Sequence, residues 1–150
     1  MRVDLAVLAE ESRAGWPAAA QSERVRELAE IRERIDAEII RTVGQWDAEG
    51  CWADDGALSA ASWLAEHTPM NCAAANRIVR SARLVREHQA TAEALASRAV
   101  SSVHVDTIAT VTRNREDLYP EGEDALLTAA EVLGARRLHR RGAALAFARR

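Results

Sequence analysis

The feature that most constrains this chain is a stripe of apolar residues at every third or fourth position between residues 22 and 49. This spacing matches the turn of an α-helix, about 3.6 residues, and places the stripe on one side of the helix. The stripe consists of Val25, Leu28, Ile31, Ile35, Ile39, Val43 and Trp46. Ser22 is expected to cap the helix start, and Gly50 to stop it. The sequence therefore predicts one long helix over residues 22–49.

The composition favours helices throughout the chain. Alanine is the commonest residue, and long alternating runs of β-branched residues are missing. A chain of 150 residues is long enough to bury one core. With a single Phe and a single Tyr, that core must be built mainly from aliphatic side chains and the four Trp. We predict an all-α fold: a single multi-helix domain with one long N-terminal helix and helix-turn-helix-like hairpins.

The two ends of the chain carry their own signals. Residues 1–21 are interpreted as a short N-terminal helix and linker, and residues 22–150 as the helical domain. The first residues include three acids and no long apolar run, so we predict neither a signal peptide nor a membrane span, and a cytoplasmic protein. The chain ends on Arg149-Arg150 without a helix stop signal, so we expect it to continue in a longer protein.

Residues 59–85 predict a helical hairpin. Ser59 is expected to cap a first helix, Pro69 to end it, and Asn71 to cap a second. On the second helix, one side is apolar and is formed by Ala75, Ile78, Val79, Ala82 and Val85. The opposite side carries Arg77, Arg80 and Arg83. Two helices joined by a tight turn, with a cationic outer face on the second, form the outline of a helix-turn-helix.

More helices are expected after this hairpin. Residues 91–111 predict a second hairpin, with Thr91 and either Ser101 or Ser102 as caps. Another helix is expected to begin at Tyr119-Pro120, because proline suits a first helical turn. The last segment holds the densest basic cluster of the chain, formed by Arg136, Arg137, Arg140 and Arg141.

Positive and negative charges are unevenly distributed. Residues 1–66 contain 7 arginines and 14 acidic residues, whereas residues 67–150 contain 13 arginines and 9 acidic residues. All 20 basic residues are arginine. An acidic front and a basic back fit a module with one anion-facing side, and they equally fit two halves that complement each other.

No residue pattern indicates a catalytic or metal site. Cys51 and Cys72 are too few for a disulfide framework or a zinc site and are expected to be buried or half-buried free thiols. Asp54-Asp55-Gly56 is interpreted as a turn, because no third ligand follows at the spacing of a calcium loop. His104 has no nearby partner in the sequence and is interpreted as a packed side chain. We therefore predict no catalytic residue, no metal and no cofactor, and no enzymatic activity for this chain by itself.

Four stretches, taken in their order and spacing, resemble a known family. They are Trp63-Leu64-Ala65, residues 75–84, residues 91–96 and residues 101–105 with His104. Over residues 22–150 the chain resembles the 13E12-repeat family of high-GC Gram-positive bacteria, also called domain of unknown function 222. In that family, the helical region usually precedes a C-terminal HNH endonuclease module.

The resemblance implies a nucleic-acid context, and a nuclease in the longer protein. This chain has no counterpart of the paired His and Asn of the HNH module. It also departs from the family at Arg98, where members tend to have glycine. If this turn needs a positive φ, arginine there costs about 1 kcal/mol.

Two hypotheses about function follow. In the first, the chain binds or positions DNA for an HNH endonuclease-like protein, and its arginines contact phosphates: Arg77, Arg80, Arg83, Arg136, Arg137, Arg140 and Arg141. In the second, the chain is a helical dimerisation or protein-docking module without direct nucleic-acid contact, and a homodimer forms through the 22–49 helix. A general anion or RNA binder is a third alternative that the sequence does not separate from the first.

Overall fold

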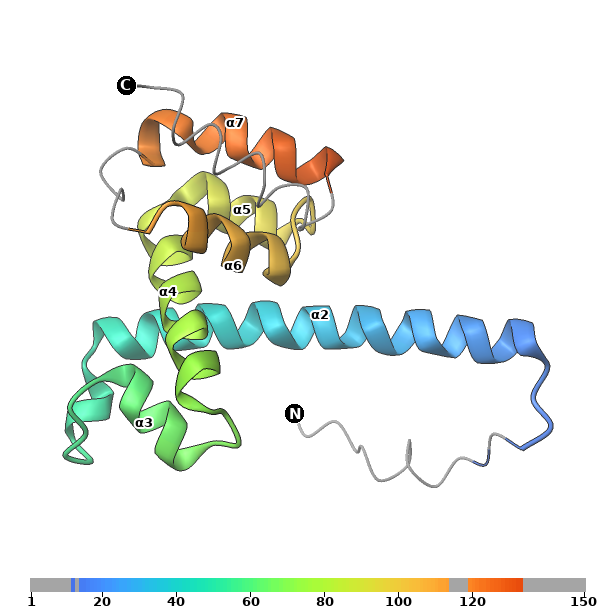
Figure 1. Ribbon diagram of the computed structural model, residues 1–150, viewed down its shortest axis with the longest axis horizontal. Coiled ribbons are helices and arrows are strands. Elements are labelled where there is room, and N and C mark those ends of the chain that lie inside the picture. The colour runs from blue at the N-terminus through green and yellow to red at the C-terminus, as the bar shows by residue number, and fades with distance from the viewer. Residues whose placement is uncertain (1–11, 13, 114–118, 134–150) are drawn as a thin grey trace. The chain divides into compact units, whose positions relative to one another are not determined.

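The computed structural model describes residues 12, 14–113 and 119–133 (Figure 1). In chain order its helices are α2 (Ala18–Ala48), the 3₁₀-helix η1 (Cys51–Ala53), α3 (Ala60–His67), α4 (Cys72–Glu87), α5 (Gln89–Ala96), α6 (Ser102–Val111) and α7 (Tyr119–Val132). The described residues form no strand, which confirms the predicted all-α class. None of these helices combines the length and apolar character that crossing a bilayer requires. Most of the predicted helix over residues 2–13 and all of the 136–141 cluster lie outside the described residues.

The chain divides into two compact units, residues 1–32 and 33–150, with the boundary inside α2. In the first unit, α2 begins at Ala18, so Ser22 lies inside the helix and the prediction that it caps the helix is wrong. Alanine is the best helix former, and the helix begins with three of them. The carbonyl of Pro17 accepts the first hydrogen bond, from the N–H of Gln21 at 3.1 Å.

The apolar stripe of α2 is buried only near the C-terminal end of the helix. Val43 is buried there, and so is Ile40, which the predicted stripe did not include. Val25, Leu28 and Ile35 remain 67%, 37% and 43% exposed. Gly50 has a φ of 70° and ends the helix as predicted, because glycine adopts this left-handed conformation without strain.

The predicted hairpin of α3 and α4 is confirmed, including both of its caps. Ser59 Oγ accepts the N–H of Ser62 at 3.1 Å, and the Ser62 side chain bonds back to the Ser59 backbone. Asn71 Oδ1 accepts the N–H of Ala74 at 2.9 Å. The aromatic ring of Trp63 on α3 packs edge-on against Trp46 of α2, with centroids 4.9 Å apart. These contacts fix α3 against the end of α2 and the start of α4.

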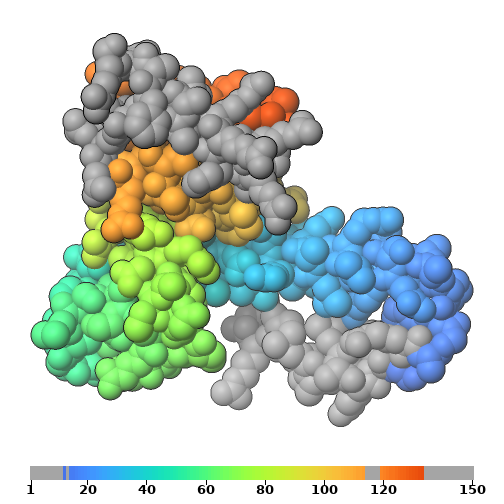
Figure 2. Space-filling view, in the orientation of Figure 1, coloured from blue at the N-terminus to red at the C-terminus, as the bar shows by residue number. Residues whose placement is uncertain are grey.

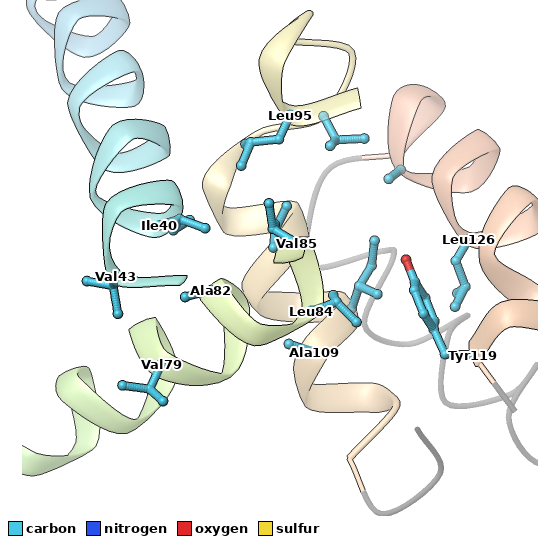
Figure 3. Close-up of a cluster of buried hydrophobic side chains, with 14 of the residues drawn as sticks. Ile40, Val43, Val79, Ala82, Leu84, Val85, Leu95, Ala109, Tyr119 and Leu126 are labelled. Carbon is cyan, nitrogen blue, oxygen red and sulfur yellow. The ribbon is translucent and has the colours of Figure 1, made fainter. Parts of the chain in front are cut away.

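In the second unit, α4 lies at the centre of the core and contacts α3, α5 and α6 (Figures 1 and 3). Of the residues predicted for its apolar side, Ala75, Val79, Ala82 and Val85 are buried, and Ile78 is half-buried. The buried side is wider than predicted, because Ser81 and Leu84 are buried as well. The other buried apolar residues are Ile40, Val43, Ala60, Leu64, Leu95, Val100, Val105, Ile108, Ala109, Tyr119, Leu126, Leu127 and Ala130.

Two polar contacts bring the N-terminus of α6 against other helices. Ser101 Oγ accepts the N–H of His104, as predicted for a cap. His104 Nδ1 accepts the N–H of Ser101 at 3.2 Å, so Nε2 carries the hydrogen that it donates to the Leu133 carbonyl at 3.0 Å. The carboxylate of Glu33 on α2 accepts both the N–H and the hydroxyl of Ser102. A carboxylate at a helix N-terminus is favourable, so Glu33 and His104 connect α6 to α2 and to the end of α7.

Thr91 is not a helix cap, because α5 begins at Gln89 and Thr91 lies inside the helix, fully buried. Its N–H and its hydroxyl both donate to Glu123 Oε1 on α7, at 2.9 and 2.6 Å. Because the Thr91 hydroxyl gives its hydrogen to Glu123, it accepts one from the Tyr119 hydroxyl at 2.7 Å. This buried network, which the sequence did not predict, joins α5 to α7.

Tyr119 is expected to make the protein unstable at alkaline pH. Burial disfavours the charged phenolate and raises the pKa of Tyr119 to about 12, and the negative charge of Glu123 acts in the same direction. The unfolded chain ionises near 10, so the free energy of unfolding should fall by about 3 kcal/mol between pH 10 and 12. Tyr119 is the chain's single tyrosine, so tyrosinate absorbance titrates it alone.

In urea unfolding at neutral pH, Tyr119→Phe should lower the free energy of unfolding by about 1 kcal/mol, because it removes one hydrogen bond. The free energy of unfolding of this variant should change much less between pH 10 and 12 than that of the unaltered chain. If Tyr119 in the folded protein titrates with a pKa near 10, burial does not raise its pKa and this prediction is wrong.

Arg98 is the one described non-glycine residue with a positive φ, 65°. It follows the end of α5, where the N–H of Arg98 donates to the Leu95 carbonyl at 3.2 Å and the N–H of Val100 to the Ala94 carbonyl. Arg98 thus occupies a left-handed position after the helix end, where glycine is the favoured residue.

We expect Arg98→Gly to raise the free energy of unfolding by about 1 kcal/mol, because it removes the clash between Cβ and the following carbonyl. Arg98→Ala is the matched control, since it shortens the side chain but keeps Cβ. Equal stability of the two variants in urea unfolding would show that this turn is not strained.

Candidate nucleic-acid interface

The arginines of α4 follow one another at intervals of three residues, as Arg77, Arg80, Arg83 and Arg86. Each such step falls about 60° short of a full helical turn. Arg77 and Arg86 therefore lie on opposite sides of α4. The row of arginines winds around the helix, so its two ends meet different neighbours.

At the C-terminal end of α4, Arg83 binds Asp47 of α2. Arg83 Nε and Nη2 donate to the two carboxylate oxygens of Asp47, at 2.8 and 3.1 Å. Arg86 Nη1 lies 3.6 Å from the same carboxylate. The Asp47 side chain is only 5% exposed, and the hydrogen bond from Arg83 lowers the pKa of Asp47, against the effect of burial. Arg83 therefore fastens α4 to α2.

Arg77 and Arg80 lie before Arg83 on α4, and neither pairs with Asp47 of α2. The Arg77 side chain is 55% exposed, and its Nε lies 3.9 Å from Asp106 Oδ2 of α6, too far for a hydrogen bond. Arg80 is half-buried, and it makes no ion pair with any described residue. Figure 2 shows atoms of α4 at the surface beside those of α6. Arg77 and Arg80 are thus the two α4 arginines that are not held by a hydrogen-bonded carboxylate in the described part of the chain.

The surface around Arg77 is shaped by small and polar residues. Ala73 and Asn76 are exposed on the same first turns of α4. Asn76 Nδ2 donates to the Cys72 carbonyl at 2.7 Å, so this amide is held along the helix. Short side chains here allow another surface to approach the helix backbone closely.

The remaining candidate residues can be placed as follows. Arg136, Arg137, Arg140 and Arg141 lie outside the described residues. Asp54-Asp55-Gly56 forms the predicted turn, in which Gly56 has a φ of 75° and Asp55 accepts the indole N–H of Trp63 at 2.6 Å. Cys51 is half-buried as predicted, but Cys72 is exposed because it lies in the first turn of α4. No group of three metal-ligating side chains comes together among the described residues.

Sequence reasoning missed the two carboxylates that decide the roles of these arginines. Asp47 lies 36 positions before Arg83, and Asp106 lies 29 positions after Arg77. No local spacing signals such pairs. The one hint was Gly44, one turn before Asp47, because a small residue inside a helix can mark a close helix contact.

The fold and this site define a class of protein: an all-helical domain with a helix-turn-helix-like hairpin whose second helix carries arginines. A comparison with family models matches residues 22–147 to one described as "Domain of unknown function (DUF222)". The chain belongs to this family, which confirms the resemblance drawn from its sequence. Searches of the curated proteins and of the solved structures find no similar protein.

Removal of Arg83 should destabilise the fold, because the nearly buried Asp47 loses both of its hydrogen bonds from this guanidinium and keeps the more distant Arg86 as its cationic neighbour among the described residues. We expect Arg83→Ala to lower the free energy of unfolding by about 1–3 kcal/mol near neutral pH. Since folding lowers the pKa of Asp47 below 3.8, the pair stabilises fully above that pH, and its contribution is lost as the pH falls below it.

Urea unfolding from neutral to acid pH measures both effects, with Arg41→Ala as the control. Arg41 pairs with Glu38 on the surface of α2, so its removal should cost less than about 1 kcal/mol. If Arg83→Ala is no more harmful than Arg41→Ala, Arg83 does not anchor α4.

Proposed function

We propose that this domain binds or positions duplex DNA, with α4 as the helix that approaches the duplex. The observation that carries the proposal is the pair formed by the exposed Arg77, in the N-terminal half of α4, and the half-buried Arg80, one turn further along. α3 precedes α4 in the hairpin. In helix-turn-helix proteins, the N-terminal residues of the second helix face the DNA. Arg77 and Arg80 would contact phosphates, and Arg83 would hold α4 in place.

Duplex DNA fits this surface better than duplex RNA does. The major groove of B-DNA admits an α-helix, whereas the major groove of A-form RNA is too deep and narrow for side chains to read. Ala73 and Asn76 are short enough for the start of α4 to enter a groove. Phosphate contacts by arginine give affinity and orientation, so we propose that sequence reading is secondary.

The family suggests the setting of this role. Resemblance to the 13E12-repeat family implies an HNH endonuclease module in the longer protein, and we propose that the present domain delivers DNA to it. The arginines at 136, 137, 140 and 141 would add phosphate contacts. Such a role implies work in the cytoplasm, where bacterial DNA lies, and requires no enzymatic activity or cofactor of this domain.

The test is fluorescence anisotropy of the chain with a labelled random duplex over a salt series. Arg77→Gln with Arg80→Gln should weaken binding about 10-fold or more at low salt. The plot of log affinity against log salt concentration should become less steep by about 1–2, because each phosphate contact that is lost lowers the number of released counterions by close to one. Glutamine keeps the side-chain stem, so the half-buried Arg80 site stays packed.

The control for charge is Arg26→Gln with Arg41→Gln, which removes two exposed arginines from α2. It should leave the affinity and the salt slope nearly unchanged. Equal effects of the two double variants would contradict a role for α4. Tighter binding of a matched RNA duplex would point to RNA instead.

One observation favours the alternative, a dimerisation module. Val25, Leu28 and Ile35 leave much of the α2 stripe exposed, and exposed apolar surface often marks a protein interface. If no duplex binds at low salt and sedimentation velocity finds a dimer that Leu28→Glu dissociates, the alternative replaces the DNA proposal. A dimer that binds DNA is compatible with it, because helix-turn-helix modules often bind as dimers.

A further inference from the structure

Asp106 is an acidic residue at the edge of the surface proposed to meet DNA. It lies on α6, and its Oδ2 faces Arg77 Nε at 3.9 Å. Its side chain is 34% exposed, so it is accessible beside the exposed Arg77. A phosphate that approached Arg77 would meet this carboxylate as well.

No hydrogen bond among the described residues explains an aspartate at this position. Asp106 Oδ1 is buried and has no hydrogen-bond partner among the described residues. A buried acceptor without a donor is unfavourable, and the contact to Arg77 is too long to be a hydrogen bond. Asp47 differs in this respect, since Arg83 donates to both of its oxygens. Among the described residues, Asp106 therefore accepts no hydrogen bond at Oδ1, yet its charge opposes that of Arg77.

We infer that Asp106 tunes DNA affinity by competing with phosphate for Arg77. This inference rests on the proposed function and names a regulating residue of the same surface. In the free protein, Asp106 neutralises Arg77; on the duplex, Arg77 exchanges this carboxylate for a phosphate. This exchange lowers the net free energy that Arg77 gains when it binds a phosphate. The domain therefore releases non-specific DNA more readily than it would if Arg77 had no opposing carboxylate.

Competition for Arg77 predicts a gain of binding when the competing carboxylate is removed. Asp106→Asn keeps the shape of the side chain and removes its charge. It should raise affinity for a random duplex about 2- to 5-fold at low salt, the scale of one partly exposed ion pair. In the Arg77→Gln background, the same substitution should have much less effect, because no arginine remains to be released.

The experiment is a double-mutant cycle by fluorescence anisotropy with four proteins: the unaltered chain, Asp106→Asn, Arg77→Gln and the double variant. Asp124→Asn on α7 removes one exposed acid and serves as the charge-matched control, because α7 makes its main described contacts with α5. Thermal unfolding checks that each protein is folded, and Asp106→Ser replaces Asp106→Asn if the latter is not.

The outcomes separate the inference from the function on which it rests. A gain of affinity that depends on Arg77 supports both. If the unaltered chain binds but Asp106→Asn gives no gain, or gives the same gain without Arg77, competition for Arg77 is overturned and DNA binding stands. If neither the unaltered chain nor Asp106→Asn binds at low salt, the proposed function fails, and this inference fails with it.

Discussion

The close approach of α2 and α4 at Gly44 is the constraint on which the site depends. A Cβ at this position would lie 3.0 Å from the backbone carbonyl oxygen of Ala82, so only glycine fits without movement of one helix. One turn further along α2, Asp47 reaches the guanidinium of Arg83. The short distance at Gly44 thus brings Asp47 within hydrogen-bonding distance of α4, and this carboxylate holds Arg83 in place.

Because the row of arginines winds around α4, the arginines at its two ends have different neighbours. Because positions three residues apart drift around the helix, Arg83 and Arg86 turn toward Asp47, whereas Arg77 turns toward Asp106. Counting positive charges in α4 therefore overstates the charge available to a ligand. Of the predicted trio, Arg83 is hydrogen-bonded to a nearly buried carboxylate, Arg77 faces a carboxylate at 3.9 Å, and Arg80 pairs with no described carboxylate.

The local features of the fold could be read from the sequence, and the long-range ones could not. Caps at Ser59 and Asn71 and the stop at Gly50 depend on neighbouring residues, so their patterns were visible. Leu84 is buried, whereas Ile35 is exposed although it belongs to a regular apolar stripe. Both outcomes depend on which other helices pack on each face. The partners of Arg83 and Thr91 come from distant helices, and no periodicity reports them.

The left-handed backbone of Arg98 bears on which substitutions this turn accommodates. Every arginine codon is a single base change away from a glycine codon, so the residue that suits this turn is within immediate mutational reach. The chain nevertheless carries arginine there, with a φ of 65°. The fold therefore accommodates the left-handed backbone of a residue with a Cβ at the junction between α5 and α6, where Leu95 and Val100 are buried on either side of the turn.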